Sequence, residues 1–198
     1  MNVVMNLLLL LFIGYYTWTF VQLMIKMRKN KILPTTNEEI AAIRKYPRKV
    51  VDAPTFSKQK VGIIIYLILL VFVITMYLIG TFQVELDWSL FLLLFIPLIN
   101  ADNLLNLFAV AEDGLLIGNR FIDWKKLKSF RFVPIDFNHK YYGYEEEINK
   151  GYELIIKERL FSVSCIVTSE AMKEKLSKIL CEHGVVNEEM NSQRSELK

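Results

Sequence analysis

The chain has 198 residues, of which 53% are apolar, and a formal net charge of +3. It contains only two histidines, and the Gly-rich phosphate loop, His-Glu-x-x-His, Gly-x-Ser-x-Gly and Cys-x-x-Cys patterns do not occur in it. The sequence therefore argues against an enzyme. It predicts no catalytic residue, no cofactor and no metal site.

Three apolar runs occupy most of the first half: Asn2 to Ile25, Val61 to Phe82 and Leu86 to Val110. About 20 apolar residues, rising roughly 1.5 Å each, cross the hydrocarbon core of a bilayer. The first two runs contain no Asp, Glu, Lys or Arg. Burying such continuous apolar surface is hard for a soluble chain of this size, so the sequence predicts an integral membrane protein with three transmembrane helices.

The first run differs from a cleaved signal peptide. No basic residue precedes it, it is longer than a signal-peptide core, and the basic stretch Lys26 to Lys31 follows it in place of a small-residue cleavage site. We therefore expect an uncleaved membrane helix.

Basic residues are concentrated between the first two runs. Residues 26–60 contain ten basic and three acidic residues, whereas residues 83–88 contain no basic one. Because Lys and Arg near span ends stay on the cytoplasmic side, we expect the N-terminus outside the cell membrane and the C-terminal half in the cytoplasm. Three prolines interrupt the basic segment, which leaves room for one short helix near residues 38–45.

A basic segment beside an anionic inner leaflet is attracted to lipid headgroups. The candidate membrane-surface contacts are Arg44, Lys45, Arg48, Lys49, Lys125 and Lys126. For the last two, solvated charge on a strand is an equally good interpretation. A nucleic-acid binder carries its basic residues on the folded domain, so no nucleic-acid partner is expected.

The third run is interrupted by polar residues. Pro97 removes a backbone donor and is expected to kink a helix. Asp102 and Asn106 are four residues apart and share a helix face, with Asn103 beside them. An ionisable group inside a span marks a candidate ion or proton site, so these three residues form a candidate intramembrane polar patch. The alternative, which we favour, is that the helix reaches the interface near Asn100 and Asp102 is hydrated.

The C-terminal half has the periodicity of strands. Short apolar or alternating runs are separated by turn sequences such as Asp113-Gly114 and Gly118-Asn119. We expect strands within residues 107–111, 115–117, 120–122, 128–133, 152–157 and 161–167. The spacing of Met172, Leu176, Ile179 and Leu180 then predicts one amphipathic helix, and Gly184 ends it.

The segment from Gly114 to Phe130, which reads GLLIGNRFIDWKKLKSF, resembles bacterial pleckstrin-homology-like domains. In that family a glycine, a hydrophobic pair of strands and a Trp-x-x-Leu sequence precede the next strand, and a terminal helix closes the barrel. The resemblance covers roughly residues 107–183. It implies a PH-like antiparallel β-barrel or sandwich closed by a C-terminal helix, with Trp124 as a packing residue. Many such domains follow transmembrane helices in small proteins of uncharacterised function.

The predicted fold class is therefore membrane α + β. The expected parts are helix 1 (residues 1–25), a basic cytoplasmic loop (26–60), helices 2 and 3 as a hairpin (61–110), the PH-like domain (111–184) and a polar tail (185–198).

The connection over residues 136–150 combines aromatic and acidic residues. Tyr141, Tyr142 and Tyr144 precede three consecutive glutamates. Tyrosine supplies contact area at low entropic cost, which makes these residues a candidate partner-binding loop. The alternative is that the tyrosines lie over the barrel rim while the glutamates are solvated.

Two function classes remain open at this point. The first is a membrane-anchored, non-enzymatic scaffold or regulatory protein, whose cytoplasmic domain binds a protein or lipid partner at the inner leaflet. The second is an accessory subunit or protomer of a transporter or channel, with Asp102 on the polar path. The expected partners are the lipid bilayer and another protein, either a membrane complex or a second copy of the chain.

Overall fold

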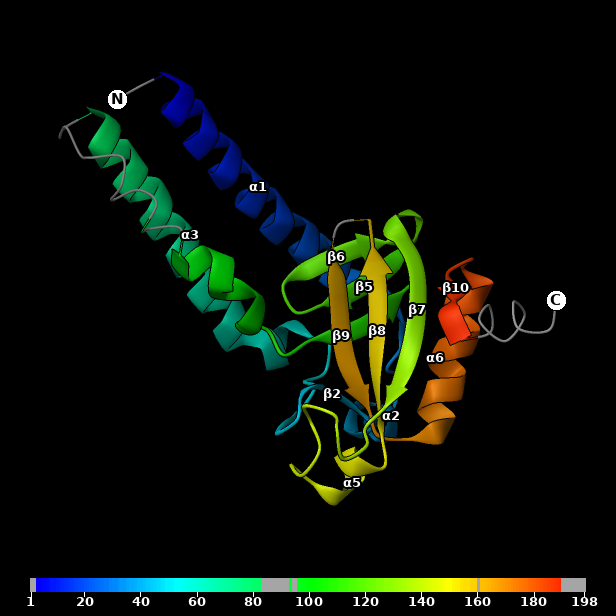
Figure 1. Ribbon diagram of the computed structural model, residues 1–198. Helices are drawn as coiled ribbons and strands as arrows, with labels where there is room; N and C mark the ends of the chain where they lie inside the picture. The colour runs from blue at the N-terminus through cyan, green and yellow to red at the C-terminus, as the bar shows by residue number, and fades with distance from the viewer. Residues whose placement is uncertain (1–2, 83–92, 94–95, 160, 190–198) are drawn as a thin grey trace. The chain divides into compact units, whose positions relative to one another are not determined.

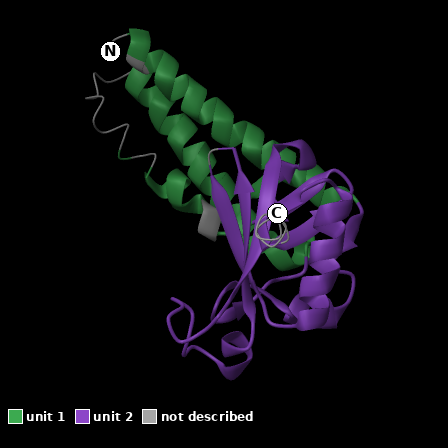
Figure 2. Ribbon diagram, turned by 45° about the vertical axis from the view of Figure 1, so that its right-hand side comes forward, with its two compact units in different colours: residues 1–29, 54–105, 118–121 green, residues 30–53, 106–117, 122–198 purple. Residues whose placement is uncertain are grey.

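A computed structural model describes every residue except 1–2, 83–92, 94–95, 160 and 190–198 (Figure 1). The chain forms two compact units, coloured separately in Figure 2. The helical unit contains residues 1–29, 54–105 and 118–121, and the β domain contains residues 30–53, 106–117 and 122–198.

The helical unit is built on two long helices. α1 is Val3–Arg28 and α3 is Phe56–Phe82. Within them, Asn6–Arg28 and Phe56–Thr81 are each long and apolar enough to cross a membrane, as the first two apolar runs predict. Most of the third predicted span lies outside the described residues.

α1 and α3 pack in antiparallel directions. Leu9 packs with Val73, and the ring of Phe20 stacks on that of Tyr66 with the centroids 5.0 Å apart. As the residue number increases along α1, the number of the contacting residue in α3 therefore decreases. Tyr66 is fully buried, and its hydroxyl donates a hydrogen bond to the backbone oxygen of Tyr16 at 3.3 Å. The one polar atom of that side chain is thus satisfied within the helix pair.

The end of the third apolar run packs along α3. Leu98 packs with Val73, and Leu104 approaches Gly62, so this segment runs antiparallel to α3. A Cβ atom at residue 62 would lie 2.5 Å from the backbone oxygen of Leu104. Glycine is therefore required at this crossing, because any side chain would push the two backbones apart.

The β domain contains two open sheets (Figure 1). In the first, the order is β1-β4-β5-β6, which are Lys31–Leu33, Phe108–Ala111, Gly114–Ile117 and Arg120–Asp123. In the second, the order is β10-β7-β8-β9-β2-β3, which are Val186–Asn187, Leu127–Pro134, Tyr152–Glu158, Ser162–Val167, Ile43–Tyr46 and Lys49–Val50. Strands β7, β8 and β9 form an antiparallel meander, and β10 joins β7 in parallel.

Three of these strands come from the segment between α1 and α3. β1 pairs antiparallel with β4, β2 pairs antiparallel with β9, and β3 pairs with β2. The segment also holds the expected short helix, α2 (Asn37–Ala41), which begins with a capping box formed by Thr36 and Glu39. The predicted loop of residues 26–60 therefore supplies sheet strands in addition to one helix.

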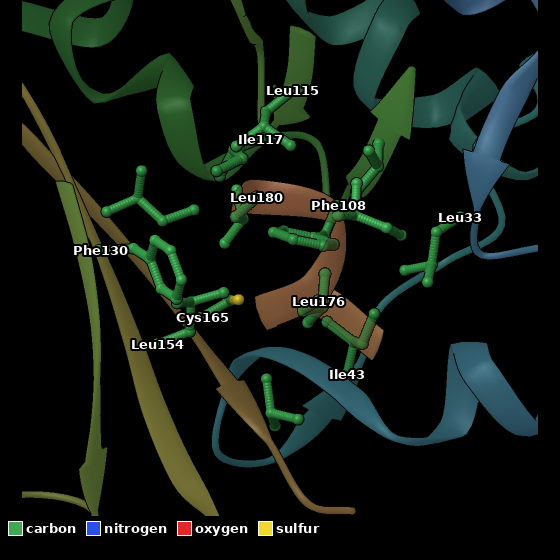
Figure 3. Close-up of a cluster of buried hydrophobic side chains, with 14 of the residues drawn as sticks. Leu33, Ile43, Phe108, Leu115, Ile117, Phe130, Leu154, Cys165, Leu176 and Leu180 are labelled. Atoms are coloured by element: carbon green, nitrogen blue, oxygen red, sulfur yellow. The ribbon is translucent and has the colours of Figure 1, made fainter. Parts of the chain in front are cut away.

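The core of the β domain lies between the sheets and α6 (Glu170–Glu182), as Figure 3 shows. Phe130, Leu154 and Cys165 point from β7, β8 and β9 toward Leu176 and Leu180 of α6. The four apolar residues predicted for this helix are all buried. Trp124 packs against the core from η2 (Trp124–Lys126), stacks on the imidazole of His183 at 4.1 Å and donates its indole N–H to the backbone oxygen of Glu112.

Two parts of the predicted fold need correction. The sheets are open, whereas a PH-like β-barrel or sandwich closed by a C-terminal helix was expected. The third predicted membrane helix was also placed too far along the chain, to Val110. In the structure a short 3-10 helix, η1 (Asn100–Asn103), is followed by the strand β4 before that residue is reached. β4 is buried along its whole length, and a strand covered on both faces is as apolar as a membrane helix.

Gly62→Ala is expected to lower the thermal unfolding midpoint of the detergent-solubilised protein, because the new methyl group meets the backbone of Leu104. Gly14→Ala is the matched control, since a Cβ atom at that helical position has nothing within 4 Å. In a helix interior, alanine is otherwise favoured over glycine by about 1 kcal/mol, so the control is expected to keep or raise the midpoint. Equal midpoints for the two variants would contradict the close crossing.

Glu39 joins α2 to α6, which leads to a prediction about pH. Burial alone would raise the pKa of Glu39, but its ion pair with Lys175 and hydrogen bonds from Thr35 and Thr36 lower this pKa to about 2. Stability from this group is therefore complete well above pH 4.5 and is lost as the pH falls from about 4.5 toward 2. Glu39→Gln is expected to cost about 1–2 kcal/mol of unfolding free energy at pH 7.

The difference in unfolding free energy between wild type and Glu39→Gln should shrink between pH 5 and pH 3. Glu38→Gln, on the same helix but exposed, is the control for charge alone. A difference that stayed constant down to pH 3 would show that the carboxylate of Glu39 is not held in its ionised form by these partners.

Candidate functional site

Residues 136–150 connect β7 to β8 and are here called the aromatic loop. The loop includes one helical turn, α5 (Glu146–Asn149), and ends next to Gly151, just before β8. The hairpin of β2 and β3 contributes side chains to the same place. Arg44 of β2 makes the connection, and it is one of the residues predicted for the membrane surface.

Arg44 is buried and holds two glutamates of the aromatic loop. Its Nη1 atom donates to Glu145 at 2.6 Å and to the backbone oxygen of Pro47 at 3.2 Å, and Nη2 donates to Glu147 at 2.8 Å. The Arg44 side chain is only 7% exposed. The structure thus places this guanidinium beneath the aromatic loop, and two of the three glutamates are ion-paired with it.

A second buried cluster fixes the start of the loop. The Glu153 side chain, 4% exposed, lies 3.0 Å from Nε2 of His139 and 2.9 Å from Nζ of Lys140. Burial alone would raise the pKa of Glu153, but hydrogen bonds from Lys140, Ser164 and His139 lower it overall. The backbone N–H of Tyr141 donates to Nδ1 of His139 at 3.2 Å, so the proton of a neutral imidazole is on Nε2, facing Glu153.

The middle of the loop is closed by a third contact. The backbone N–H of Gly143 donates to the side-chain oxygen of Asn149 at 2.8 Å. Gly143 has φ +86°, a left-handed conformation that favours glycine. Tyr141 packs against a small buried cluster of Ile135, Ile148 and Ile166.

These contacts leave three aromatic side chains of the loop, Phe137, Tyr142 and Tyr144, facing solvent. Tyr142 and Tyr144 are each 48% exposed, and the guanidinium carbon of Arg48 lies 5.6 Å from the centroid of the Tyr144 ring. We call Arg48, Tyr142 and Tyr144 the docking face. Tyr and Arg are the residue types that supply most binding energy at protein interfaces, and a loop held by buried ion pairs loses little entropy on binding.

The other predicted surface residues lie in two separate segments. Lys45 lies near the ring of Tyr46, at 5.3 Å, and exposed Lys49 forms an ion pair with Asp52 at 3.1 Å. Lys125 and Lys126 are exposed in η2, between β6 and β7. Of the six predicted cations, one is buried, three flank the β2–β3 turn and two lie in η2.

Asn106, predicted as part of an intramembrane patch, lies in the β domain. Its side-chain amide donates to the backbone oxygen of Val50 at 2.6 Å and to Asp52 at 3.3 Å, and its backbone oxygen accepts from the N–H of Asp52 at 2.8 Å. Asn106 thus joins the chain before β4 to the end of β3. The side chains of Asp102 and Asn103 lie outside the described residues.

The chemistry of the remaining candidate groups is structural. Cys165 is buried, and burial, followed by the nearby charge of Glu153, raises the pKa of its thiol, which keeps the nucleophilic thiolate from forming. Both ring nitrogens of His139 are engaged, one by Glu153 and one by Tyr141. Within the described part of the chain, no three His, Cys, Asp or Glu side chains gather as a metal site.

Sequence reasoning could not find Arg44 as the residue that holds the aromatic loop. Its two carboxylate partners are about a hundred positions away in the sequence. The acidic run 145–147 was visible, but nothing in the sequence indicates which distant cation faces it.

Comparisons of the chain with protein-family models, with curated proteins and with solved structures give no match. The resemblance to PH-like domains therefore stays a prediction from the sequence, and the function has to be argued from the geometry.

Arg44→Gln is expected to release the aromatic loop, because Glu145 and Glu147 lose their shared cation. The loss should be about 1–3 kcal/mol of unfolding free energy, the range for hydrogen bonds to charged groups. Amide hydrogen exchange in residues 136–150 should become faster, while exchange in β8 changes little. Lys49→Gln, which removes an exposed cation of the same hairpin, is the control; equally fast loop exchange in both variants would contradict the role of Arg44.

Proposed function

We propose that this chain is a membrane-anchored, non-enzymatic scaffold or regulatory protein that presents its β domain to a protein partner at the cytoplasmic side of the membrane. The observation that carries the proposal is the pairing of β1 and β2, which lie between two apolar helices in the sequence, with β4 and β9 of the C-terminal half.

This pairing restricts the path of the chain through a bilayer. If α1 and α3 both cross, residues 30–53 lie on the side between the two crossings, and the strands that pair with them lie on that side too. The chain leaves α3 on the opposite side at Phe82, so it has to return between Phe82 and Asn106. This requirement supports the predicted third crossing, as does the antiparallel packing of Leu98 and Leu104 along α3.

Charge supports the orientation. Residues 26–60, which include the last turn of α1, the connection and the first turn of α3, carry ten basic residues, and basic segments near span ends remain in the cytoplasm. The β domain, which includes this connection, would therefore be cytoplasmic, with the N-terminus on the outer side.

The docking face supports a protein partner. Arg48, Tyr142 and Tyr144 come from two segments distant in the sequence and are held in place by the buried ion pairs of Arg44 and Glu153. Such a preorganised aromatic and cationic surface resembles the centre of a protein interface. A transporter role would instead depend on Asp102.

The proposal is tested by affinity purification of the full-length chain from its native membranes in mild detergent, followed by quantification of the proteins that co-purify. With the double variant Tyr142→Ala/Tyr144→Ala, the amount of a discrete partner protein that co-purifies is expected to fall at least tenfold. Two interface aromatics commonly contribute more than about 1.4 kcal/mol of binding free energy together. Phe161→Ala, an aromatic at the opposite end of β8 and 61% exposed, is expected to retain that partner.

Thermal unfolding of both variants should match wild type, which separates lost binding from lost folding. Recovery of the same proteins with wild type and with both variants would contradict docking through this face. A change in ion or proton flux on Asp102→Ala, with the partner unaffected by the tyrosine variants, would favour the transport alternative.

A further inference from the structure

The antiparallel pairing of α1 and α3 brings their charged ends together. Because Phe20 stacks on Tyr66 and the two helices are antiparallel, residue 26 of α1 lies near residue 60 of α3. The guanidinium carbon of Arg28 lies 5.8 Å from the ring centroid of Phe56, which confirms that the last turn of α1 adjoins the first turn of α3. The cations of both turns therefore lie at one end of the helical unit.

The turn between β5 and β6 belongs to the same end. Residues 118–121 cluster with the helices, and Nζ of Lys26 lies 4.1 Å from the ring centroid of Phe121. The backbone of Arg120 is therefore adjacent to the last turn of α1. Together these residues form what we call the basic collar: Lys26, Arg28, Lys29, Lys58, Lys60 and Arg120.

Apolar side chains adjoin the collar directly. Ile25, which precedes Lys26, is 54% exposed, and Val61, which follows Lys60, is 70% exposed. On each helix, a cation of the collar and an exposed apolar residue are therefore direct neighbours in the sequence. Two phenylalanine rings, Phe56 and Phe121, lie beside collar cations, each within about 6 Å of one. Aromatic and basic residues combined in this way are typical of the headgroup region of a membrane.

We propose that the basic collar binds the phosphate of anionic phospholipids of the inner leaflet, with the acyl chains lying along the exposed apolar faces of α1 and α3. Several cations at one end recognise the phosphate, and the adjoining apolar surface selects a lipid over a free phosphate ion. These residues are distinct from the predicted contacts at Arg44, Lys45, Arg48 and Lys49, and they lie entirely within the helical unit.

The inference rests on the proposed membrane anchoring, so the test begins with reconstitution of the full-length protein. The protein is placed in vesicles of phosphatidylcholine alone or with phosphatidylglycerol, and the enrichment of each lipid around it is measured with spin-labelled lipids. Phosphatidylglycerol should be enriched over phosphatidylcholine, and the triple variant Arg28→Gln/Lys58→Gln/Lys60→Gln should reduce this enrichment about tenfold.

The matched control is Lys128→Gln/Arg131→Gln/Lys178→Gln, which removes the same charge from exposed residues of the β domain and should leave the enrichment unchanged. Equal enrichment of both lipids, or an equal loss in both triple variants, would overturn the lipid site. Displacement of phosphatidylglycerol by millimolar inorganic phosphate at constant ionic strength would assign the collar to free phosphate instead. Failure of the wild-type protein to insert into either vesicle would contradict the anchoring itself, which is a separate outcome.

Discussion

Backbone hydrogen bonding between distant segments is the constraint on which the structure depends. Residues 30–53 connect two apolar helices, yet their strands complete both sheets of the β domain through β4 and β9. An extended strand satisfies its backbone groups only beside another strand, so β1 and the outer edge of β2 depend on strands of the C-terminal half. The chain passes between its two units five times, at residues 29, 53, 105, 117 and 121.

Side-chain contacts strengthen the same connection at three places. Glu39 of α2 pairs with Lys175 of α6, Arg44 of β2 pairs with the aromatic loop, and Asn106 donates to the backbone oxygen of Val50 in β3. In each case a residue between α1 and α3, or its backbone, meets a group in the C-terminal half of the chain. Ion pairs and polar hydrogen bonds of this kind add little net stability compared with apolar packing, but they are specific about which groups meet. They therefore determine how the β2–β3 hairpin sits against the rest of the β domain.

The sequence predicts those parts of the fold that depend on neighbouring residues. The periodicity of Met172, Leu176 and Leu180 correctly indicated α6, and the turn at Asp113-Gly114 correctly separated β4 from β5. The parts that depend on distant residues were missed. The strands of residues 30–53 are two to four residues long, too short to show alternation. The C-terminal partners of β1 and β2 follow more than seventy positions later. Arg44 was predicted as a surface cation because its carboxylate partners, Glu145 and Glu147, are too distant in the sequence to be recognised from neighbouring residues.

The pairing of β2 with β9 has a consequence for biosynthesis. Ile43 meets Val167, so an early strand has to wait until about 120 further residues have been made. At roughly 5–20 residues per second, translation needs about 6–25 s for that interval. During this time the first helix has emerged, while β1 and β2 have exposed edges that can pair with other chains. The order of synthesis therefore makes the nascent chain, more than the finished protein, the state in which these strand edges are open to pairing with other chains.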